Sequence, residues 1–139
     1  MKTLIVYTSK SGATKECALL LQKRINNSSV CDLNNNKVDI MSYDSIVLGT
    51  GVRMSKIYKP MIKFIKQNLS LLLNKKIGIY LCNGYPDSFS KTVEKYIPDK
   101  LLTHATCVLS FGGKQPFSSM GIDEWINIQN VNDLSSKFL

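Results

Sequence analysis

Short apolar runs alternate along the chain with longer segments in which apolar residues recur every three or four positions. Several of these runs are continuous instead of alternating with polar residues, which is typical of parallel strands that are covered on both faces. We therefore expect five strands, at residues 3–7, 30–33, 45–49, 77–82 and 105–111.

The segments between these runs have the spacing of amphipathic helices. One helix is predicted to follow the first strand and to include residues 18–25, and another to span residues 89–101 with a break before Pro98. Asn130 has the character of a helix cap and predicts a short last helix. A further helix tolerates Pro60 in its first turn and contains the apolar residues Tyr58, Met61, Ile62, Ile65, Leu69 and Leu72.

Alternating strands and helices predict right-handed crossovers and therefore a three-layer, doubly wound α/β fold built on a parallel sheet. The length of 139 residues fits a single domain, residues 1–139. In such sheets, ligands bind at the carboxyl ends of the strands, where the strand order reverses. The segments expected to form a site are therefore residues 8–14, 50–58 and 82–87.

The segment after the first strand is rich in groups that bind anions. Ser9, Ser11 and Thr14 offer hydroxyl donors. Gly12 permits close approach of the backbone, and Lys10 supplies a positive charge. The helix that follows would add free N–H groups and the positive end of its dipole. The alternative is a plain helix cap by Ser11 or Thr14; the segment is neither a Walker motif nor a dinucleotide fingerprint.

Two segments of the chain resemble those of flavodoxin-like proteins. The run "YTSKSGATKE" resembles the flavodoxin phosphate loop, a Ser/Thr-x-Ser/Thr-Gly-x-Thr pattern after the first strand. The run "YDSIVLGTGVRMSKIYKPMIKFI" resembles the corresponding segment of the menaquinone-dependent protoporphyrinogen IX dehydrogenase branch, in which a Gly-x-x-Ile/Val-Arg run precedes a helix. The resemblance covers roughly residues 1–112 and implies a flavodoxin-like five-stranded parallel sheet in the order 2-1-3-4-5.

The resemblance also implies a cofactor, flavin mononucleotide (FMN), and the residues that would hold it. Tyr85 would stack on the isoalloxazine ring, since the tryptophan that many flavodoxins use is absent from these loops, and Arg53 would be the catalytic residue. The phosphate would be held by Ser9, Lys10, Ser11, Gly12, Ala13 and Thr14, and the ring would lie between Thr50, Gly51, Val52, Arg53 and Met54 on one side and Cys82, Asn83, Gly84 and Tyr85 on the other.

Several other chemistries are excluded by the residues present. Four scattered cysteines and one histidine do not form a zinc pattern, and we expect reduced thiols and no metal site. A receiver domain needs paired acidic residues after the first strand, where this chain has Thr8 and Ser9. A phosphatase of this fold would need a nucleophilic cysteine in that loop, and Cys17 lies too far along the helix.

The formal net charge of +8 is unevenly distributed. No acidic residue lies between Asp44 and Asp87, whereas Lys59, Lys63 and Lys66 fall on one face of a predicted helix. This face is either a solvated lysine surface or a docking surface for an anionic substrate, an acidic partner or a lipid surface. Nucleic acid is not expected as a partner, because interleaved aromatic residues are missing and arginine is almost absent from the patch.

Three functions remain open from the sequence. The first is an FMN oxidoreductase that takes two electrons from a small, protoporphyrinogen-like substrate and delivers them to a quinone or similar acceptor. The second is a one-electron carrier that docks to redox partners, and the third is a flavin-poor interaction module. The N-terminus lacks a signal-peptide pattern, so we expect a cytoplasmic protein, with association to a membrane surface left open.

Overall fold

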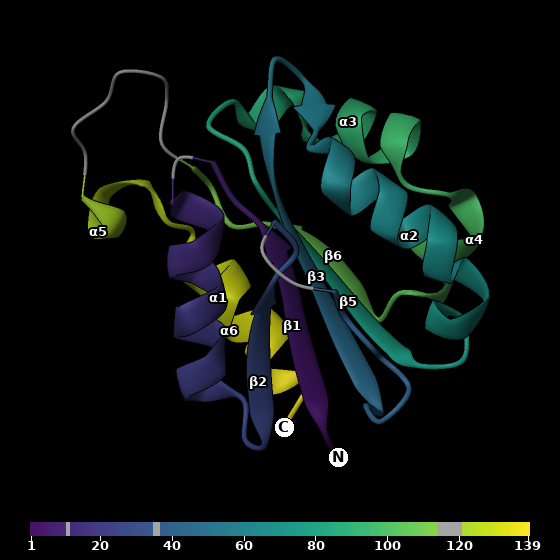
Figure 1. The fold of residues 1–139 in the computed structure, drawn as a ribbon. Coiled ribbons are helices and arrows are strands. Elements are labelled where there is room, and N and C mark those ends of the chain that lie inside the picture. Colours follow the sequence, from purple (N-terminus) through teal and green to yellow (C-terminus); the bar gives the residue numbers. More distant parts are fainter. Residues whose placement is uncertain (11, 35–36, 114–120) are drawn as a thin grey trace.

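The fold is built on five parallel strands (Figure 1), in a computed structural model that describes residues 1–10, 12–34, 37–113 and 121–139. The strands are β1 (Thr3–Thr8), β2 (Ser28–Asp32), β3 (Ser45–Arg53), β5 (Lys76–Cys82) and β6 (Cys107–Ser110). They lie in the order β2-β1-β3-β5-β6. This order confirms the predicted order 2-1-3-4-5, because each long apolar run forms one strand and each crossover carries a helix or a long loop.

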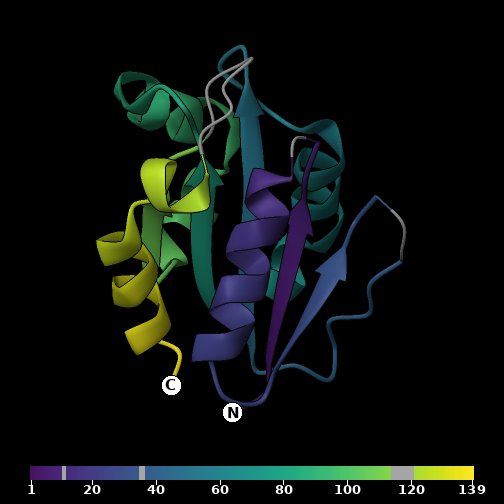
Figure 2. The same cartoon turned by 90° about the vertical axis from the view of Figure 1, so that its left-hand side faces the viewer.

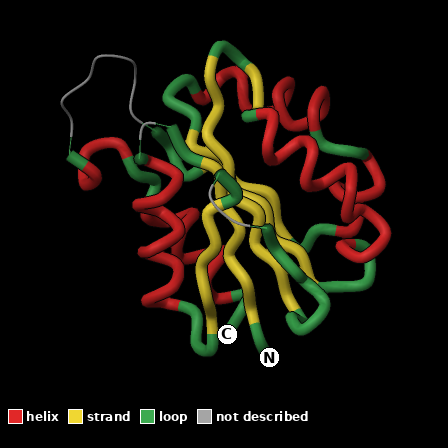
Figure 3. The backbone as a smooth tube through the Cα atoms, viewed as in Figure 1, coloured by secondary structure: helices red, strands yellow, loops and turns green. Residues whose placement is uncertain are grey.

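Helices cover both faces of the sheet, as Figures 1 and 2 show. On one face lie α1 (Ala13–Arg24) and α6 (Ile128–Ser136), and on the other lie α2 (Lys59–Leu72), α3 (Phe89–Tyr96) and α4 (Asp99–His104). The strands form the middle layer between the two sets of helices (Figure 3). Two short elements, η1 (Pro86–Ser88) and α5 (Ile122–Trp125), lie in the connections. The predicted three-layer architecture is therefore confirmed.

Alternate residues of the strands enter two separate cores. Leu4 and Val6 of β1 belong to the core that includes residues of α2, α3 and α4, whereas Ile5 and Tyr7 belong to the core that includes residues of α1 and α6. All four side chains are at most 5% exposed. A strand buried on both faces needs apolar residues at consecutive positions, which explains the continuous apolar runs.

Some element boundaries differ from the predicted ones. β3 continues through Arg53, and the two-residue strand β4 (Lys56–Ile57) returns antiparallel to it, so most of residues 50–58 form a hairpin instead of the predicted loop. The predicted break before Pro98 is confirmed, because α3 ends at Tyr96 and α4 begins at Asp99. Asn130 does not cap the last helix; the oxygen of Asn127 accepts its backbone N–H at 3.1 Å and caps α6 instead.

The described residues show three further features that bear on their chemistry. Within these residues, no helix has the length and apolarity needed to cross a membrane. The same residues contain no group of three or more candidate metal ligands. All four cysteines are free thiols, as predicted.

Gly49 in the middle of β3 provides a test of core packing. A Cβ atom at this position would lie 2.1 Å from Cζ of the fully buried Tyr80. Gly49→Ala is therefore expected to lower the free energy of unfolding by about 1–3 kcal/mol through overpacking. Urea unfolding measures this loss. Gly121→Ala is the matched control, because a Cβ atom there meets nothing within 4 Å; equal stability losses in the two variants would contradict the packing described.

Candidate functional site

Parallel pairing brings the carboxyl ends of three strands to one edge of the sheet. Thr8 at the end of β1 pairs with Thr50 of β3, and Gly51 of β3 pairs with Cys82 at the end of β5. The Thr8 hydroxyl donates a hydrogen bond to the Thr50 hydroxyl at 3.1 Å, and both residues are at most 2% exposed. All three predicted site segments therefore begin at the same edge, and both chain termini lie at the opposite end (Figure 1).

The first segment ends at the open N-terminus of α1. Gly12 is the N-cap residue and has the left-handed backbone conformation, with φ of 93°. Its backbone N–H donates to Oγ of Ser9 at 3.0 Å, and a Cβ atom on Gly12 would meet nothing within 4 Å. No side chain caps the helix in the described structure, so the capping role considered for Thr14 is not observed. Ser11 lies outside the described residues.

Tyr80 of β5 anchors this helix terminus to the sheet. Its hydroxyl donates a hydrogen bond to the carbonyl oxygen of Thr14 at 3.0 Å. Its ring stacks on Phe111, with ring centroids 4.5 Å apart and an interplanar angle of 10°. Burial raises the pKa of the Tyr80 hydroxyl well above its usual range, so the hydroxyl remains a donor at neutral pH. The position of the α1 N-terminus is thus fixed by the core.

The second segment is the β3–β4 hairpin. Val52 pairs with Ile57 and Arg53 with Lys56, which leaves Met54 and Ser55 as a two-residue turn with φ of 52° and 61°. Thr50 and Gly51 are buried at its base, whereas Arg53 and Met54 are exposed at its tip. The predicted residues of this segment therefore divide into a buried base and an exposed tip.

Tyr58 ends the predicted site segment 50–58, although the sequence analysis assigned it no contact with the cofactor. A Cβ atom on Gly51 would lie 2.7 Å from the Tyr58 ring, so that ring covers the end of β3. Nζ of Lys10 lies 4.9 Å from the ring centroid, which links the first two segments. Burial raises the pKa of Tyr58, and the positive charge of Arg53 partly offsets that rise.

The third segment is shaped by the side chain of Asn83, which is 2% exposed. Its Nδ2 donates to Oγ of Ser88 at 2.9 Å, and its Oδ1 accepts the backbone N–H of Tyr85 at 3.0 Å. Ser88 donates in turn to the carbonyl oxygen of Tyr85. Tyr85 itself is 57% exposed, so its ring is available for stacking but has no position fixed by the core. Its predicted stacking role therefore stays a prediction.

Cys82 and Cys17 lie beneath the first and third segments. Cys82 ends β5 and Cys17 lies in α1, and their sulfur atoms are 3.6 Å apart. A hydrogen bond with Cys82 and burial raise the pKa of Cys17 far above the usual range of a thiol. Cys17 is therefore a neutral packing residue at neutral pH and does not provide a nucleophile.

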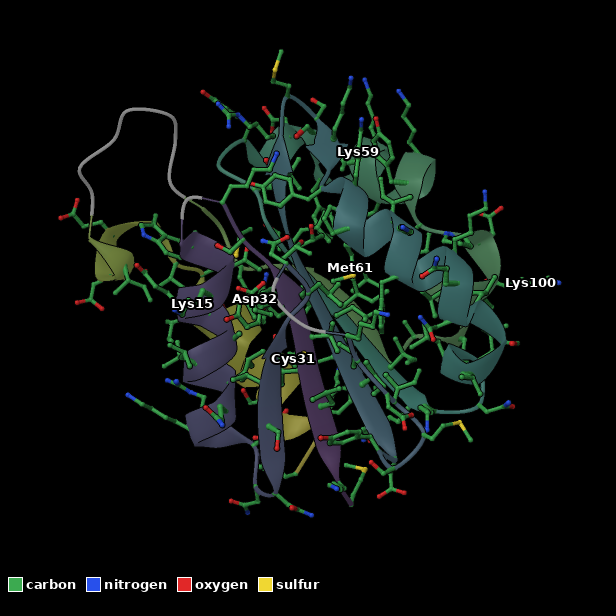
Figure 4. All side chains as sticks on the ribbon, viewed as in Figure 1. Lys15, Cys31, Asp32, Lys59, Met61 and Lys100 are labelled. Atoms are coloured by element: carbon green, nitrogen blue, oxygen red, sulfur yellow. The ribbon has the colours of Figure 1, made fainter. Side chains whose placement is uncertain are left out.

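The basic residues of the site lie at its exposed rim. Arg53, Lys56 and Lys59 are all exposed, and no acidic residue occurs in the sequence from Ser45 to Pro86. Figure 4 shows Lys59 at the hairpin end of α2, whereas Met61 of the same helix points toward the sheet. Lys63 and Lys66 continue the exposed face along α2, as the helical spacing predicted.

Comparison with known proteins agrees with this architecture. A family model described as "Flavodoxin domain" matches residues 4–137. No curated protein matches the sequence significantly.

Three solved structures share the fold at low sequence identity. A short-chain flavodoxin associated with a bacterial microcompartment has a TM-score of 0.73 and 18% identity, covering 99% of this chain and 97% of its own. A WrbA-like flavodoxin from Agrobacterium tumefaciens has a TM-score of 0.65 and 15% identity, covering 99% of both chains. A flavoprotein from Lactobacillus acidophilus, solved in complex with FMN, has a TM-score of 0.62 and 18% identity, covering 78% of this chain and 92% of its own. The family match spans nearly the whole sequence, so the chain belongs to the flavodoxin domain family.

Proposed function

We propose that the protein binds FMN at the carboxyl ends of β1, β3 and β5 and acts as an oxidoreductase. The observation that carries this proposal is the uncapped N-terminus of α1 beside two other strand ends. Helix N-terminal N–H groups bind a phosphate monoester through hydrogen bonds and through the positive end of the dipole. One such terminus suits a mononucleotide, which has a single phosphate.

The residues present fit such a group. Gly12 has open space where a side chain would stand, and Ser9 holds the backbone of that turn. Lys10 lies at the same turn with its ammonium group over Tyr58, where it would also attract the phosphate. The flavin ring would lie between the β3–β4 hairpin and the segment that Asn83 shapes, and Tyr58 and Tyr85 are the aromatic side chains there. The Lactobacillus acidophilus flavoprotein, which shares the fold and was solved in complex with FMN, supports FMN as the ligand.

FMN would supply the electron chemistry, and the chain would supply its electrostatic setting. Arg53 and Lys56 at the exposed rim favour negative charge on the reduced ring, since no carboxylate lies between Asp44 and Asp87 to oppose them. We infer a raised reduction potential and two-electron oxidation of a small, protoporphyrinogen-like substrate, with a quinone or similar acceptor. Arg53 is the residue assigned to this role.

Two alternatives use the same site differently. A one-electron carrier would show two separated reduction steps, and its flavin potential would depend little on Arg53. A flavin-poor interaction module would bind FMN weakly or not at all. The visible spectrum of the purified protein, with the flavin identified after heat release, distinguishes this last function from the other two.

The phosphate assignment predicts a charge-specific effect at Ser9. Ser9→Asp is expected to weaken FMN binding at least tenfold, because the carboxylate would lie close to the phosphate. Riboflavin, which lacks the phosphate, should lose little affinity. Quenching of flavin fluorescence on titration with protein measures both dissociation constants.

The matched control is Ser9→Asn, which has nearly the same shape without the charge and can still accept the Gly12 N–H bond. It should bind FMN more tightly than Ser9→Asp does. If the two variants bind FMN equally, or if riboflavin loses as much affinity as FMN, the phosphate does not lie at this helix terminus.

The electrostatic role of Arg53 predicts a change in flavin potential. Arg53→Ala is expected to lower the midpoint potential of the bound flavin by on the order of 20 mV, which corresponds to about 1 kcal/mol for two electrons. A redox titration followed by absorbance measures this shift and the number of electrons in each step.

The control is Arg24→Ala, which removes the chain's other arginine. Arg24 ends α1 at the opposite edge of the sheet and donates from Nε to Oδ1 of Asn132. Its loss should leave the potential unchanged. Two well-separated one-electron steps that Arg53→Ala does not move would favour the one-electron carrier over the oxidoreductase.

A further inference from the structure

The tip of the β3–β4 hairpin combines three features that are unfavourable for folding. Met54 and Ser55 are both left-handed, a conformation that favours glycine and asparagine in such turns. Arg53 and Lys56 form a cross-strand pair, which places two positive side chains opposite each other. The Met54 side chain is 88% exposed. When several features that destabilise the folded state occur at one position, they indicate that function constrains the sequence there.

The positive charge continues below the tip. Lys59 opens α2 directly after the hairpin, and Lys63 lies one turn further on the same exposed face. Helix α3, which packs beside β4, adds exposed Lys91 and Lys95. Within the hairpin, η1, α2 and α3, the acidic residues are Glu94 and Asp87, so these elements together carry a net positive charge. The exposed apolar side chain of Met54 thus lies at the tip of a hairpin whose neighbouring residues carry exposed positive charges.

We propose that this end of the molecule docks on an anionic lipid bilayer, with Met54 inserted among the headgroups. Membrane surfaces attract clusters of lysine and arginine, and the binding increases with each apolar group that enters the interface. A protein interface fits these residues less well, because its core is depleted of lysine and its strongest contacts come from tryptophan, tyrosine and arginine. Here the cations are lysines apart from Arg53, and the exposed tip is a single flexible thioether.

The contact is peripheral and reversible. A basic side chain near an anionic bilayer increases the partition coefficient about fivefold, and one methionine adds a comparable factor. Docking would turn the carboxyl edge of the sheet toward the bilayer. If the proposed function is right, the flavin then faces the layer in which a lipid-soluble quinone is dissolved. The docking itself requires no flavin and is testable without it.

The experiment is co-sedimentation of the full chain, with and without added FMN, on two kinds of vesicle. One is phosphatidylcholine alone and the other contains about one third phosphatidylglycerol. We expect binding to the anionic vesicles only, and a decrease of at least tenfold as the salt concentration rises from about 0.01 M to about 0.15 M. Binding by the flavin-free protein supports docking even if FMN fails to bind, so the two proposals fail separately.

Substitutions at the hairpin tip distinguish a loss of vesicle binding from a loss of folding stability. Met54→Asn places a residue that suits the left-handed turn, so it should raise stability and yet weaken vesicle binding about fivefold. Lys56→Gln should likewise relieve the repulsion from Arg53 and weaken binding about fivefold. Thermal unfolding measures stability, and neither loss of binding can then arise from misfolding.

Matched controls exist at the other end of the molecule. Met41 is 66% exposed before the amino end of β3, and Lys23 is exposed in the last turn of α1. Met41→Asn and Lys23→Gln should leave vesicle binding unchanged. The docking proposal is overturned if the protein does not bind anionic vesicles, or if the control variants lose as much binding as the tip variants. It is also overturned if the protein binds soluble polyglutamate but not the vesicles.

Discussion

The hydrogen bond from the Tyr80 hydroxyl to the carbonyl oxygen of Thr14 joins the two halves of the candidate site. Tyr80 lies near the carboxyl end of the interior strand β5, and Thr14 lies in the first turn of α1. The ring of Tyr80 fills the space that Gly49 leaves on β3 and stacks on Phe111 beyond β6. One side chain therefore holds the N-terminus of α1 against the strand ends, and it fixes the spacing between the first and third segments of the candidate site.

Much of this architecture could be predicted because a strand that is buried on both faces has apolar residues at consecutive positions, a pattern that is visible in the sequence. The continuous apolar runs located every parallel strand, and the alternation of strands with helices determined the crossovers. The edge of the sheet that bears the site followed from topology. The segment proposed to hold the phosphate is predicted from local residue types, because Ser9, Lys10 and Gly12 are polar or small directly after a buried strand.

The second segment was harder to predict for physical reasons. Thr50 to Arg53 has no continuous apolar character, so β3 seemed to end at Gly49. Met54 and Ser55 lack the Asn-Gly or Asp-Gly signature of a two-residue turn, and β4 is too short to form a pattern. The contact of Tyr58 with Lys10 joins residues 48 positions apart in the sequence, and such contacts depend on the assembled fold. The bonds of Asn83 are short-range but depend on the direction of its buried side chain.

The β3–β4 hairpin also has a consequence for the order in which the chain assembles. The strands of the hairpin are adjacent in sequence, whereas β1 and β3 pair across a long crossover. Sequence separation alone would therefore predict that the hairpin forms first during folding. Two ladder pairs and a left-handed turn without glycine cannot hold it closed alone. It can close only after β3 has joined the sheet, and it is a natural place for the native structure to fray. The β3–β4 hairpin on the outer side of the site is thus expected to form late in folding and to open independently of the core. Such opening would let a bulky ring enter the site while the core stays intact.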